Sequence, residues 1–488
     1  MKFMKNDTSN LLLQNGSYCN KLKLQLVITF MISLWINTNV YAGSAAIINF
    51  EFNLVKTTPL LHPPYISGIV GDTNDIAFAK GIVLSVKEND KPIAANDYQI
   101  KVSSSNENIV SSKNVLVEKN NGEVIIKIKA SAVGYSNITL SVVKGKNSEE
   151  LIINYAASAT NKQLQTLWHT GFADASAAIP LDENYMLVGD DENNVLSVYD
   201  SKQSGLPTAI FNYEKQLNSS DDGSKEIDCE AAVRSIKNKN LIYWTGSMGN
   251  GGKHFEEKPN RSSLIATECI GSGINTKFKF KNNYTELRRE LIKWGDKNGY
   301  QFSSSAATGE KPKQLAGFNV EGMVFAPDNT TLYIAFRAPL VSITARKNAL
   351  IAPIKNFEDW YAAGHQSKKI VIDTPIELNL DGRAFRDVIK LSNNKYLIVA
   401  GNADAEKNAA IYLWSGLAKD LPILISIKNI SDLNIEAAVE VIENGKYTGK
   451  VQLLCDDGST EFYNDGVAAK HLATEHKKFR SIMVSIEN

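Results

Sequence analysis

Acidic residues recur at the start of short apolar segments from residue 163 onward. The segments read DASAAIP from 174, DCEAAVRS from 228, NVEGMVF from 319 and NIEAAVEV from 434, and FRDVIKL from 385 fits with Asp387 in the acidic place. In each, polar or acidic residues precede small residues and then a strand-like apolar run. Carboxylates placed in this way can act as general acids or bases, or can bind a hard cation such as calcium.

A second polar cluster follows each of these segments, at the end of another apolar run. The runs read YMLVGDDENN, LIYWTGSMGNGG, TLYIAFRAPL, KYLIVAGNAD and VQLLCDDGS, and further strand-like runs follow them. The unit therefore has four strands and repeats five times, with starts near 174, 228, 319, 386 and 434. A repeat of about 50 residues indicates a β-propeller. We expect five blades, and the wide gap between the second and third starts leaves room for a sixth.

The propeller geometry predicts where these polar side chains meet. The first strand of each blade lines the central channel, and the loop after the second strand lies on the same face. We expect four acids to point into the channel mouth and to form a metal site: Glu230, Glu321, Asp387 and Glu436. Around them we expect a ring of further acids, with two arginines as counter-charges: Asp174, Asp190, Asp191, Glu192, Asp228, Asp456, Asp457, Arg337 and Arg386.

Repulsion between these acids limits what the site can be. Two carboxylates ~5 Å apart at an effective dielectric near 20 repel each other by about 3 kcal/mol. Arginine pairing, a shared proton or a bound cation can offset this repulsion. Because acids outnumber arginines here, the sequence favours a calcium ion or a cationic ligand at the mouth. The alternative is structural: each acid accepts backbone N–H groups and holds neighbouring blades together.

The acidic mouth is compatible with three functions. The first is binding of a small-molecule or surface ligand at the acidic mouth, together with calcium. The second is metal-dependent hydrolysis of a phosphoester, an ester or a lactone, with Glu321 or Glu436 as base and Arg337 or Arg386 holding the anion. The third is an interaction protein without catalysis. Ser247 lies in the glycine-rich loop TGSMGNGGKH, which could offer N–H groups to an anion. The sequence has no GxSxG elbow, so a serine triad is not predicted.

The quoted segments, together with LNLDGRAFRDVIKLSNNKYLIVAGNAD, resemble the bacterial domain-of-unknown-function family 3616 from about residue 168 to the end. The short motifs of the family match this chain at the following residues: Asp174, Ser176 and Ala177; Asp191 and Glu192; Glu321 and Gly322; Arg337, Pro339 and Leu340; and Gly382, Arg383, Arg386 and Asp387. The resemblance implies a propeller fold and the location of a site, but no reaction. Where the family has a serine–histidine pair, this chain has Ser247–Met248. The resemblance therefore does not imply histidine-dependent chemistry at this position.

Residues 60–157 predict a separate domain. Short alternating runs rich in Val and Ile, separated by turn residues every 8 to 12 positions, indicate an antiparallel β-sandwich. The segments PYISGIVGDTNDIAFAKGIVLSV, VSSSNENIV and AVGYSNITLSV resemble bacterial immunoglobulin-like repeats. The propeller is expected over 163–488, with one amphipathic helix inserted near 282–300. The fold class is therefore all-β.

The N-terminal segment predicts export. Lys21 and Lys23 precede an apolar run of about 13 residues, and VYA offers a cleavage site after Ala42. We expect a signal peptide over 1–42, a linker over 43–59 and no membrane span after cleavage, with the protein periplasmic, extracellular or at the cell surface. The formal net charge is zero and Lys and Arg are spread thinly along the chain, so we expect no nucleic-acid partner. The mature chain keeps three cysteines, an odd number, so no disulfide framework is implied. We also expect the protein to be a monomer.

Overall fold

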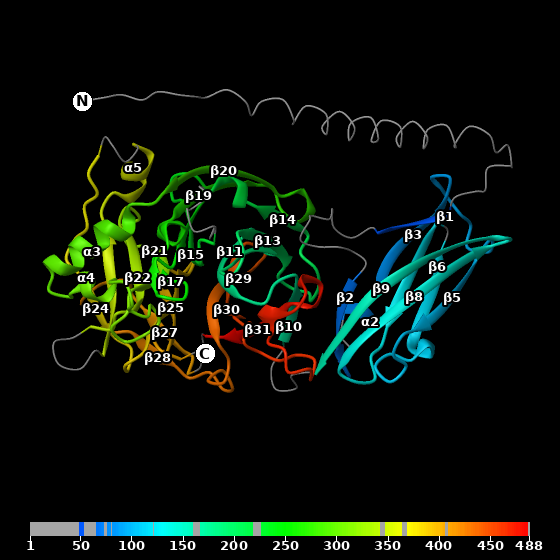
Figure 1. The fold of residues 1–488 in the computed structure, drawn as a ribbon. Coiled ribbons are helices and arrows are strands. Elements are labelled where there is room, and N and C mark those ends of the chain that lie inside the picture. The colour runs from blue at the N-terminus through cyan, green and yellow to red at the C-terminus, as the bar shows by residue number, and fades with distance from the viewer. Residues whose placement is uncertain are drawn as a thin grey trace, which may run out of the picture.

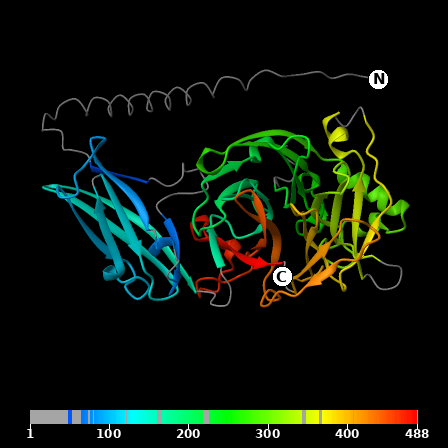
Figure 2. The same cartoon turned by 180° about the vertical axis from the view of Figure 1, so that it is seen from behind.

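The computed structural model describes residues 48–52, 65–72, 76–79, 81–120, 122–159, 166–217, 226–341, 347–363, 368–405 and 408–486. The fold is all-β, with a few short helices. Strands β1 to β9 form one unit, and strands β10 to β31 form a second unit beside it (Figures 1 and 2). The predicted signal peptide lies outside the described residues. None of the helices in the described part of the chain is both long enough and apolar enough to cross a membrane.

The first unit is a sandwich of two sheets. One sheet has the order β1-β3-β7-β6 with β4 beside β3, and the other has the order β2-β9-β8-β5. The bounds are β1 (Ile48–Phe52), β2 (Tyr65–Val70), β3 (Ile82–Glu88), β4 (Lys91–Pro92), β5 (Gln99–Ser104), β6 (Val115–Asn120), β7 (Glu123–Ile128), β8 (Gly134–Lys144) and β9 (Asn147–Ala159), with a short helix α2 (Ile76–Ala79).

Alternation of apolar residues builds the core of this sandwich. Ile82, Leu84 and Val86 of β3 are buried, and they share a core with Leu140 and Val142 of β8. The strand β1 pairs with β3 in antiparallel fashion although it lies in the segment expected to be a linker. The sandwich therefore includes part of that segment, because INFEF can extend the sheet as an edge strand.

Five four-stranded sheets make up the second unit. Their orders are β11-β12-β13-β14, β15-β16-β19-β20, β21-β22-β23-β24, β25-β26-β27-β28 and β29-β30-β31-β10. The bounds are β10 (Thr166–Thr170), β11 (Ala175–Pro180), β12 (Tyr185–Asp190), β13 (Val195–Asp200), β14 (Ala209–Asn212), β15 (Cys229–Arg234), β16 (Leu241–Gly246), β19 (Leu264–Ile270), β20 (Lys277–Tyr284), β21 (Asn319–Phe325), β22 (Leu332–Ala338), β23 (Asn348–Ile354), β24 (Ile376–Asn379), β25 (Ala384–Lys390), β26 (Tyr396–Gly401), β27 (Ala410–Trp414), β28 (Ile423–Ile425), β29 (Ile435–Glu443), β30 (Lys446–Cys455) and β31 (Lys478–Ser485).

The first strands of these sheets contact one another in a closed ring, β11 to β15, β21, β25, β29 and back to β11. This is the architecture of a β-propeller. The last sheet joins strands from both ends of the ring, because β31 pairs with β10 in antiparallel register. This pairing joins the two ends of the ring and removes a free edge.

The wide gap in the repeat holds an insertion. The two-stranded ribbon of β17 (Asn250–Gly251) and β18 (Glu256–Glu257) comes first, and α3 (Leu287–Lys297) and α4 (Phe302–Ser305) follow. The expected amphipathic helix is thus α3, whose Leu287 and Leu291 pack in a core that includes Phe302. Residues 226–341 are all described, and within them the gap adds no further four-stranded sheet. A last helix, α5 (Phe357–Ala362), packs in a core shared by the second and third ring sheets.

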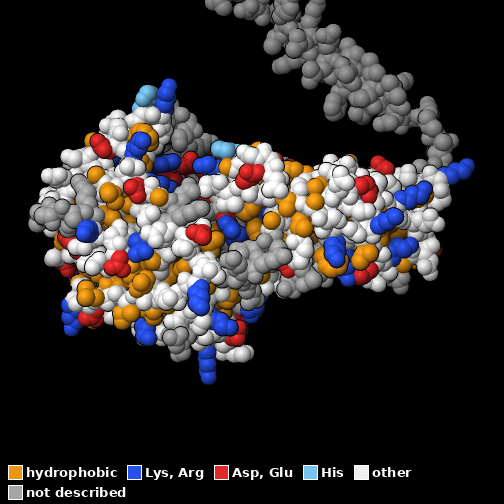
Figure 3. Space-filling model, turned by 90° about the horizontal axis from the view of Figure 1, so that it is seen from below, with side chains coloured by type: hydrophobic (Ala, Val, Ile, Leu, Met, Phe, Trp, Pro, Cys, Tyr) orange, Lys and Arg blue, Asp and Glu red, His pale blue; other side chains and the backbone are white. Residues whose placement is uncertain are grey.

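The sandwich and the ring are in direct contact. Ile69 and Ala156 of the sandwich pack in one apolar cluster with Trp168 and Phe462 of the ring. The hydroxyl of Tyr135 on β8 donates to Asp465 Oδ2 at 2.7 Å. On the face drawn in Figure 3, positive and negative side chains are interspersed, and no patch of one sign dominates.

Candidate functional site: an acidic centre lined by five β-bulges

A repeated irregularity of the innermost strands brings the charged residues to the centre. In each of the five sheets, the register between the first and second strands shifts near the start of the first strand. Each shift leaves one residue of the first strand outside the ladder: Ser176, Glu230, Glu321, Arg386 and Glu436. All five are buried. A bulge of this kind re-aims a side chain, so each sheet presents one residue differently from the rest of its strand.

The sequence predicts that Asp387 is the residue of the fourth sheet that points into the channel mouth. In the structure the corresponding bulged position is occupied by the residue before it. Arg386 is the bulged residue there, whereas Asp387 is back in the ladder opposite Val399. A shift of one residue changes the direction of a strand side chain. Asp387 Oδ1 accepts the Val388 N–H at 2.7 Å, and Oδ2 accepts the Ala438 N–H at 2.9 Å. Asp387 therefore links β25 to β29, the structural role considered for such acids.

Two arginines neutralise two of the bulged glutamates. Arg337 Nη1 donates to Glu321 Oε1 at 2.8 Å and lies 3.9 Å from Glu436 Oε1. Arg386 Nη1 donates to Glu436 Oε1 and lies 3.6 Å from Glu321 Oε2. Arg337 is itself outside the β21–β22 ladder, and the pair Val320–Phe336 separates it from the bulge at Glu321. The four side chains form an interlaced buried quartet in which two positive charges balance two negative ones.

The loop after β26 fixes both guanidinium groups. Arg337 Nε donates to the Ala403 carbonyl at 2.9 Å, and Arg386 Nη2 donates to the carbonyls of Asn402 and Ala405 at 3.0 and 2.7 Å. Burial acts to raise the pKa of Glu436, but Arg386, Lys313 and Arg337 outweigh it and lower that pKa. These contacts make Glu436 a weak base and leave the arginines engaged, so they favour a structural role for the quartet over the catalytic roles expected from the sequence.

The opposite side of the centre lacks this compensation. Asp174 precedes β11, Asp191 follows β12 and Glu230 is the bulged residue of β15. None of the three has an arginine within ion-pair distance in the described part of the chain, and Glu230 Oε1 lies 3.8 Å from Lys313 Nζ. Burial and the neighbouring carboxylates raise the pKa of Asp174 to about 9, and they raise the pKa values of Asp191 and Glu230 well above the usual range.

Seven carboxylates of the centre form three overlapping groups. The groups are Asp174, Asp190 and Asp191; Asp191, Asp228 and Glu230; and Glu230, Glu321 and Glu436. Within each group, one oxygen of every member lies within 4.8 Å of the others. Six of the seven acids have a buried oxygen without a hydrogen-bond partner, namely Asp174 Oδ2, Asp191 Oδ1, Asp228 Oδ2, Glu230 Oε1, Glu321 Oε2 and Glu436 Oε2. Of these oxygens, Asp228 Oδ2 is in an ion pair with Arg261. Closely spaced oxygens of this kind are the ligands that hard cations prefer, so the donor set fits a metal ion.

Two basic residues near this side were not expected from the sequence. Arg261 Nη1 lies 2.9 Å from Asp228 Oδ2, and its Nη2 donates to Glu226 at 2.6 Å. Lys313 precedes β21, and its side chain is 40% exposed. Neither residue belongs to the repeat, because Arg261 lies in the insertion and Lys313 in the loop that follows it. In the sequence, only their closeness to the strands β19 and β21 could have indicated that these two residues belong to the site.

The glycine-rich loop is occupied by its own backbone bonds. The N–H groups of Ser247 and Met248 donate to the carbonyls of Asp228 and Arg261, at 2.8 and 2.9 Å. The Gly249 N–H donates to Ser247 Oγ at 3.1 Å. Ser247 is fully buried, so the loop holds β15 and the insertion together instead of offering N–H groups to an anion.

The remaining expected residues surround the acidic groups. Asp456 accepts the Gly458 N–H at 2.8 Å and Asn434 Nδ2 at 3.0 Å, while Asp457 is bound by Arg480. Glu192 is 43% exposed and lies 3.8 Å from Lys470 Nζ. Asp190 accepts the Glu192 N–H and Asn193 Nδ2.

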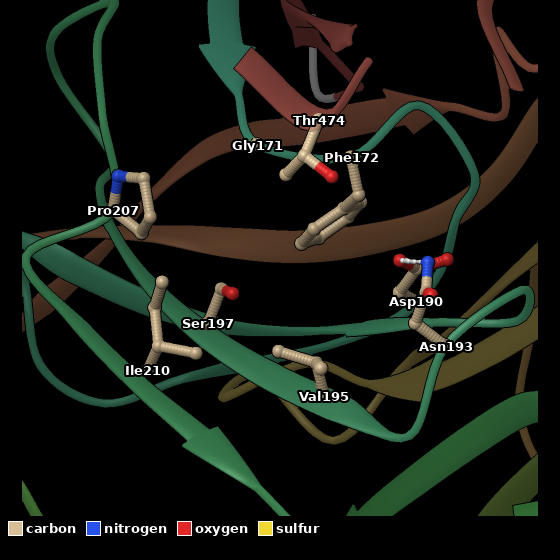
Figure 4. A pocket seen from close by; sticks show the side chains of 9 residues that line it. All are labelled: Gly171, Phe172, Asp190, Asn193, Val195, Ser197, Pro207, Ile210 and Thr474. Carbon is tan, nitrogen blue, oxygen red and sulfur yellow. Dashed lines mark hydrogen bonds between the residues drawn. The ribbon is translucent and has the colours of Figure 1, made fainter. Parts of the chain in front are cut away.

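Asp190 also lines a cavity of about 20 Å³, large enough for one water molecule, beside the first ring sheet. Figure 4 shows Asp190 and Asn193 at one side of this cavity and Phe172 and Thr474 above it. The cavity is too small for an organic ligand, so it does not replace the acidic centre as the candidate site.

No family model matches the chain, and no curated protein matches it. Among solved structures, the chain is similar to a quinonprotein alcohol dehydrogenase-like protein from Bacteroides thetaiotaomicron, at 12% identity and a TM-score of 0.27, over 89% of this chain and 99% of that one. It is also similar to a virginiamycin B lyase from Staphylococcus aureus (9% identity, TM-score 0.24, 79% and 99% covered). A third is an exo-beta-1,3-galactanase from Clostridium thermocellum (10% identity, TM-score 0.35, 65% and 62% covered). At these TM-scores the similarity supports no statement about function.

Proposed function

We propose that this chain is an exported, five-bladed β-propeller with an N-terminal immunoglobulin-like domain, and that it binds a divalent cation, calcium in the first place, at its acidic centre. Through the cation it binds an anionic small-molecule or surface ligand. The resemblance to bacterial domain-of-unknown-function family 3616 is part of this proposal. The observation that carries it is the set of buried carboxylate oxygens without hydrogen-bond partners.

The charges of the centre select one place for the cation. In the group of Glu230, Glu321 and Glu436, a cation would lie beside the guanidinium groups of Arg337 and Arg386 and would be repelled. In the group of Asp191, Asp228 and Glu230, Arg261 pairs with Asp228 at 2.9 Å and Lys313 lies 3.8 Å from Glu230, so this group has one guanidinium group beside it instead of two. We therefore assign the cation to this second group, and of the four acids expected to bind metal only Glu230 stays in the proposed ligand set.

A second candidate function is metal-dependent hydrolysis of a phosphoester, an ester or a lactone. It is favoured by the environment of Glu230, the one bulged glutamate without an arginine, whose pKa is raised well above the usual range by burial and by Glu321. A carboxylate with a raised pKa can act as a general acid or base. Lys313, 3.8 Å away and partly exposed, would attract the anionic group of a substrate. The base is then Glu230 and not Glu321 or Glu436.

Thermal unfolding with and without calcium tests the proposal. A ligand present at 100 times its Kd stabilises by about 2.7 kcal/mol, so we expect a rise in Tm of about 5 to 10 °C after calcium is added to EDTA-treated protein. Glu230→Gln should reduce the rise, because it removes a ligand of the assigned cation. Glu268→Gln is the matched control, because Glu268 lies on the same sheet next to the opposite end of β16. An equal rise in both variants would contradict the assignment, and turnover of p-nitrophenyl phosphate or a simple lactone would select the hydrolase.

A further inference from the structure

We propose that the ring binds a second divalent cation between Asp174, Asp190 and Asp191, next to the cation assigned to Asp191, Asp228 and Glu230. This inference rests on the proposed function, because the two sites share Asp191. The ligand class is a hard divalent cation, with calcium as the probe.

Asp174 provides the first argument. Its side chain is 4% exposed, and its Oδ2 has no hydrogen-bond partner although it is buried. One of its oxygens lies within 4.8 Å of oxygens of Asp190 and Asp191. A carboxylate withdrawn from water without a partner is costly, and a cation in this group would supply the missing partner.

Gly458 provides the second argument, because the absence of a side chain at this position makes room for the carboxylate of Asp174. A Cβ at position 458 would lie 1.6 Å from Asp174 Oδ1, so any larger residue would displace this carboxylate. Asp190 is fixed as well, since its two oxygens accept the Glu192 N–H at 3.0 Å and Asn193 Nδ2 at 2.7 Å. Hydrogen bonds of this kind orient carboxylates that bind metals.

The third argument is the sharing of Asp191. This residue belongs to the first and the second acidic groups, and its Oδ1 is buried without a hydrogen-bond partner. A carboxylate has two oxygens and can bridge two cations, as in two-metal sites. The two groups therefore describe neighbouring sites with one common ligand.

The charge balance agrees with two ions. On the side away from the arginines, five carboxylates outnumber two nearby ammonium groups, those of Lys313 and Lys477: Asp174, Asp190, Asp191, Glu230 and Asp456. One divalent cation would leave this side with one negative charge, so a second cation can be accommodated with a net charge of only one. Protonation of the acids is the other way to remove the charge, and it predicts fewer bound ions.

Counting bound calcium tests the inference. Full-length mature protein is stripped with EDTA, and calcium binding near neutral pH is measured by equilibrium dialysis and by isothermal titration calorimetry. We expect two ions per chain for the wild type and for Glu268→Gln. We expect one ion for Asp174→Asn and one for Gly458→Ala, which keeps every carboxylate and decides the question if Asp174→Asn does not fold.

The outcomes separate this inference from the proposed function. A single ion in the wild type, lost in Glu230→Gln but kept in Gly458→Ala, would overturn the second site and leave the first in place. No bound ion would overturn both. Two ions that persist in both Asp174→Asn and Gly458→Ala would show that the second ion binds elsewhere and would also overturn the inference.

Discussion

Arg386 and Glu436 occupy the same bulged position on two successive inner strands, and the arginine donates to the glutamate. One repeat position thus carries opposite charges in neighbouring sheets. Both side chains are almost completely buried, so each charge depends on the other.

Removing Arg386 should destabilise the ring strongly. Arg386→Met leaves Glu436 buried with Arg337, 3.9 Å away, in place of its directly bound arginine, and breaking a buried ion pair costs about 3 to 5 kcal/mol. Chemical denaturation measures the loss. The double variant Arg386→Met, Glu436→Gln should recover a large part of it, and a double variant no more stable than the single one would contradict the pairing.

The same substitution should have opposite effects at two bulged glutamates. In EDTA at neutral to alkaline pH, Glu230→Gln should stabilise the ring by up to about 3 kcal/mol, because it removes repulsion with neighbouring acids. Glu321→Gln should destabilise it by about 1 to 3 kcal/mol, because Arg337 loses its closest charged acceptor. Unfolding midpoints in EDTA show the signs, and a shared sign for both variants would argue against the division of the centre into two sides.

Asp387→Asn should weaken folding without changing calcium binding. The asparagine amide can accept only one of the two N–H groups that Asp387 accepts, which leaves one buried donor unpaired at a cost of about 1 to 3 kcal/mol. Denaturation and calcium titration of the same variant check both parts. Loss of one calcium ion would return Asp387 to the metal site.

His169 should make the ring sensitive to acid. It is fully buried on β10, Nε2 contacts Ser481 Oγ at 2.8 Å, and burial lowers its pKa to about 3. Between pH 3 and the usual pKa of about 6.5, the unfolded chain binds a proton that the folded chain does not, so this contribution to stability falls as pH decreases through this window, by about 1.4 kcal/mol per pH unit.

The variant His169→Phe provides the control for this effect. Ser481 keeps its bond from Gln452 Nε2 at 2.7 Å, and the phenyl ring can stack on Phe479 as the imidazole does. As pH falls from 7 to 4, the unfolding free energy of the wild type should therefore decrease more than that of the variant. A difference that stays constant would show that His169 is protonated in the folded state.

The sequence carries the repeat and the strand order of the ring, because apolar runs and turn residues at a regular spacing are local signals. It did not carry the register inside each inner strand. The segment AFRDVI offers an arginine and an aspartate side by side, and only the hydrogen-bond ladder decides that Arg386 is bulged and Asp387 is not. Arg261 and Lys313 were missed for a related reason, since their contacts join segments without any repeat.

The bulges separate the chemistry of the channel from the construction of its wall. Because each bulged residue takes no part in strand pairing, its identity can change while the sheet that carries it stays intact. The five positions already hold one serine, three glutamates and one arginine on a common scaffold. A lineage with this architecture can therefore acquire a new specificity through single replacements at Ser176 or Glu230, or through paired replacements at the ion-paired positions Glu321, Arg386 and Glu436, without rebuilding its hydrophobic interior.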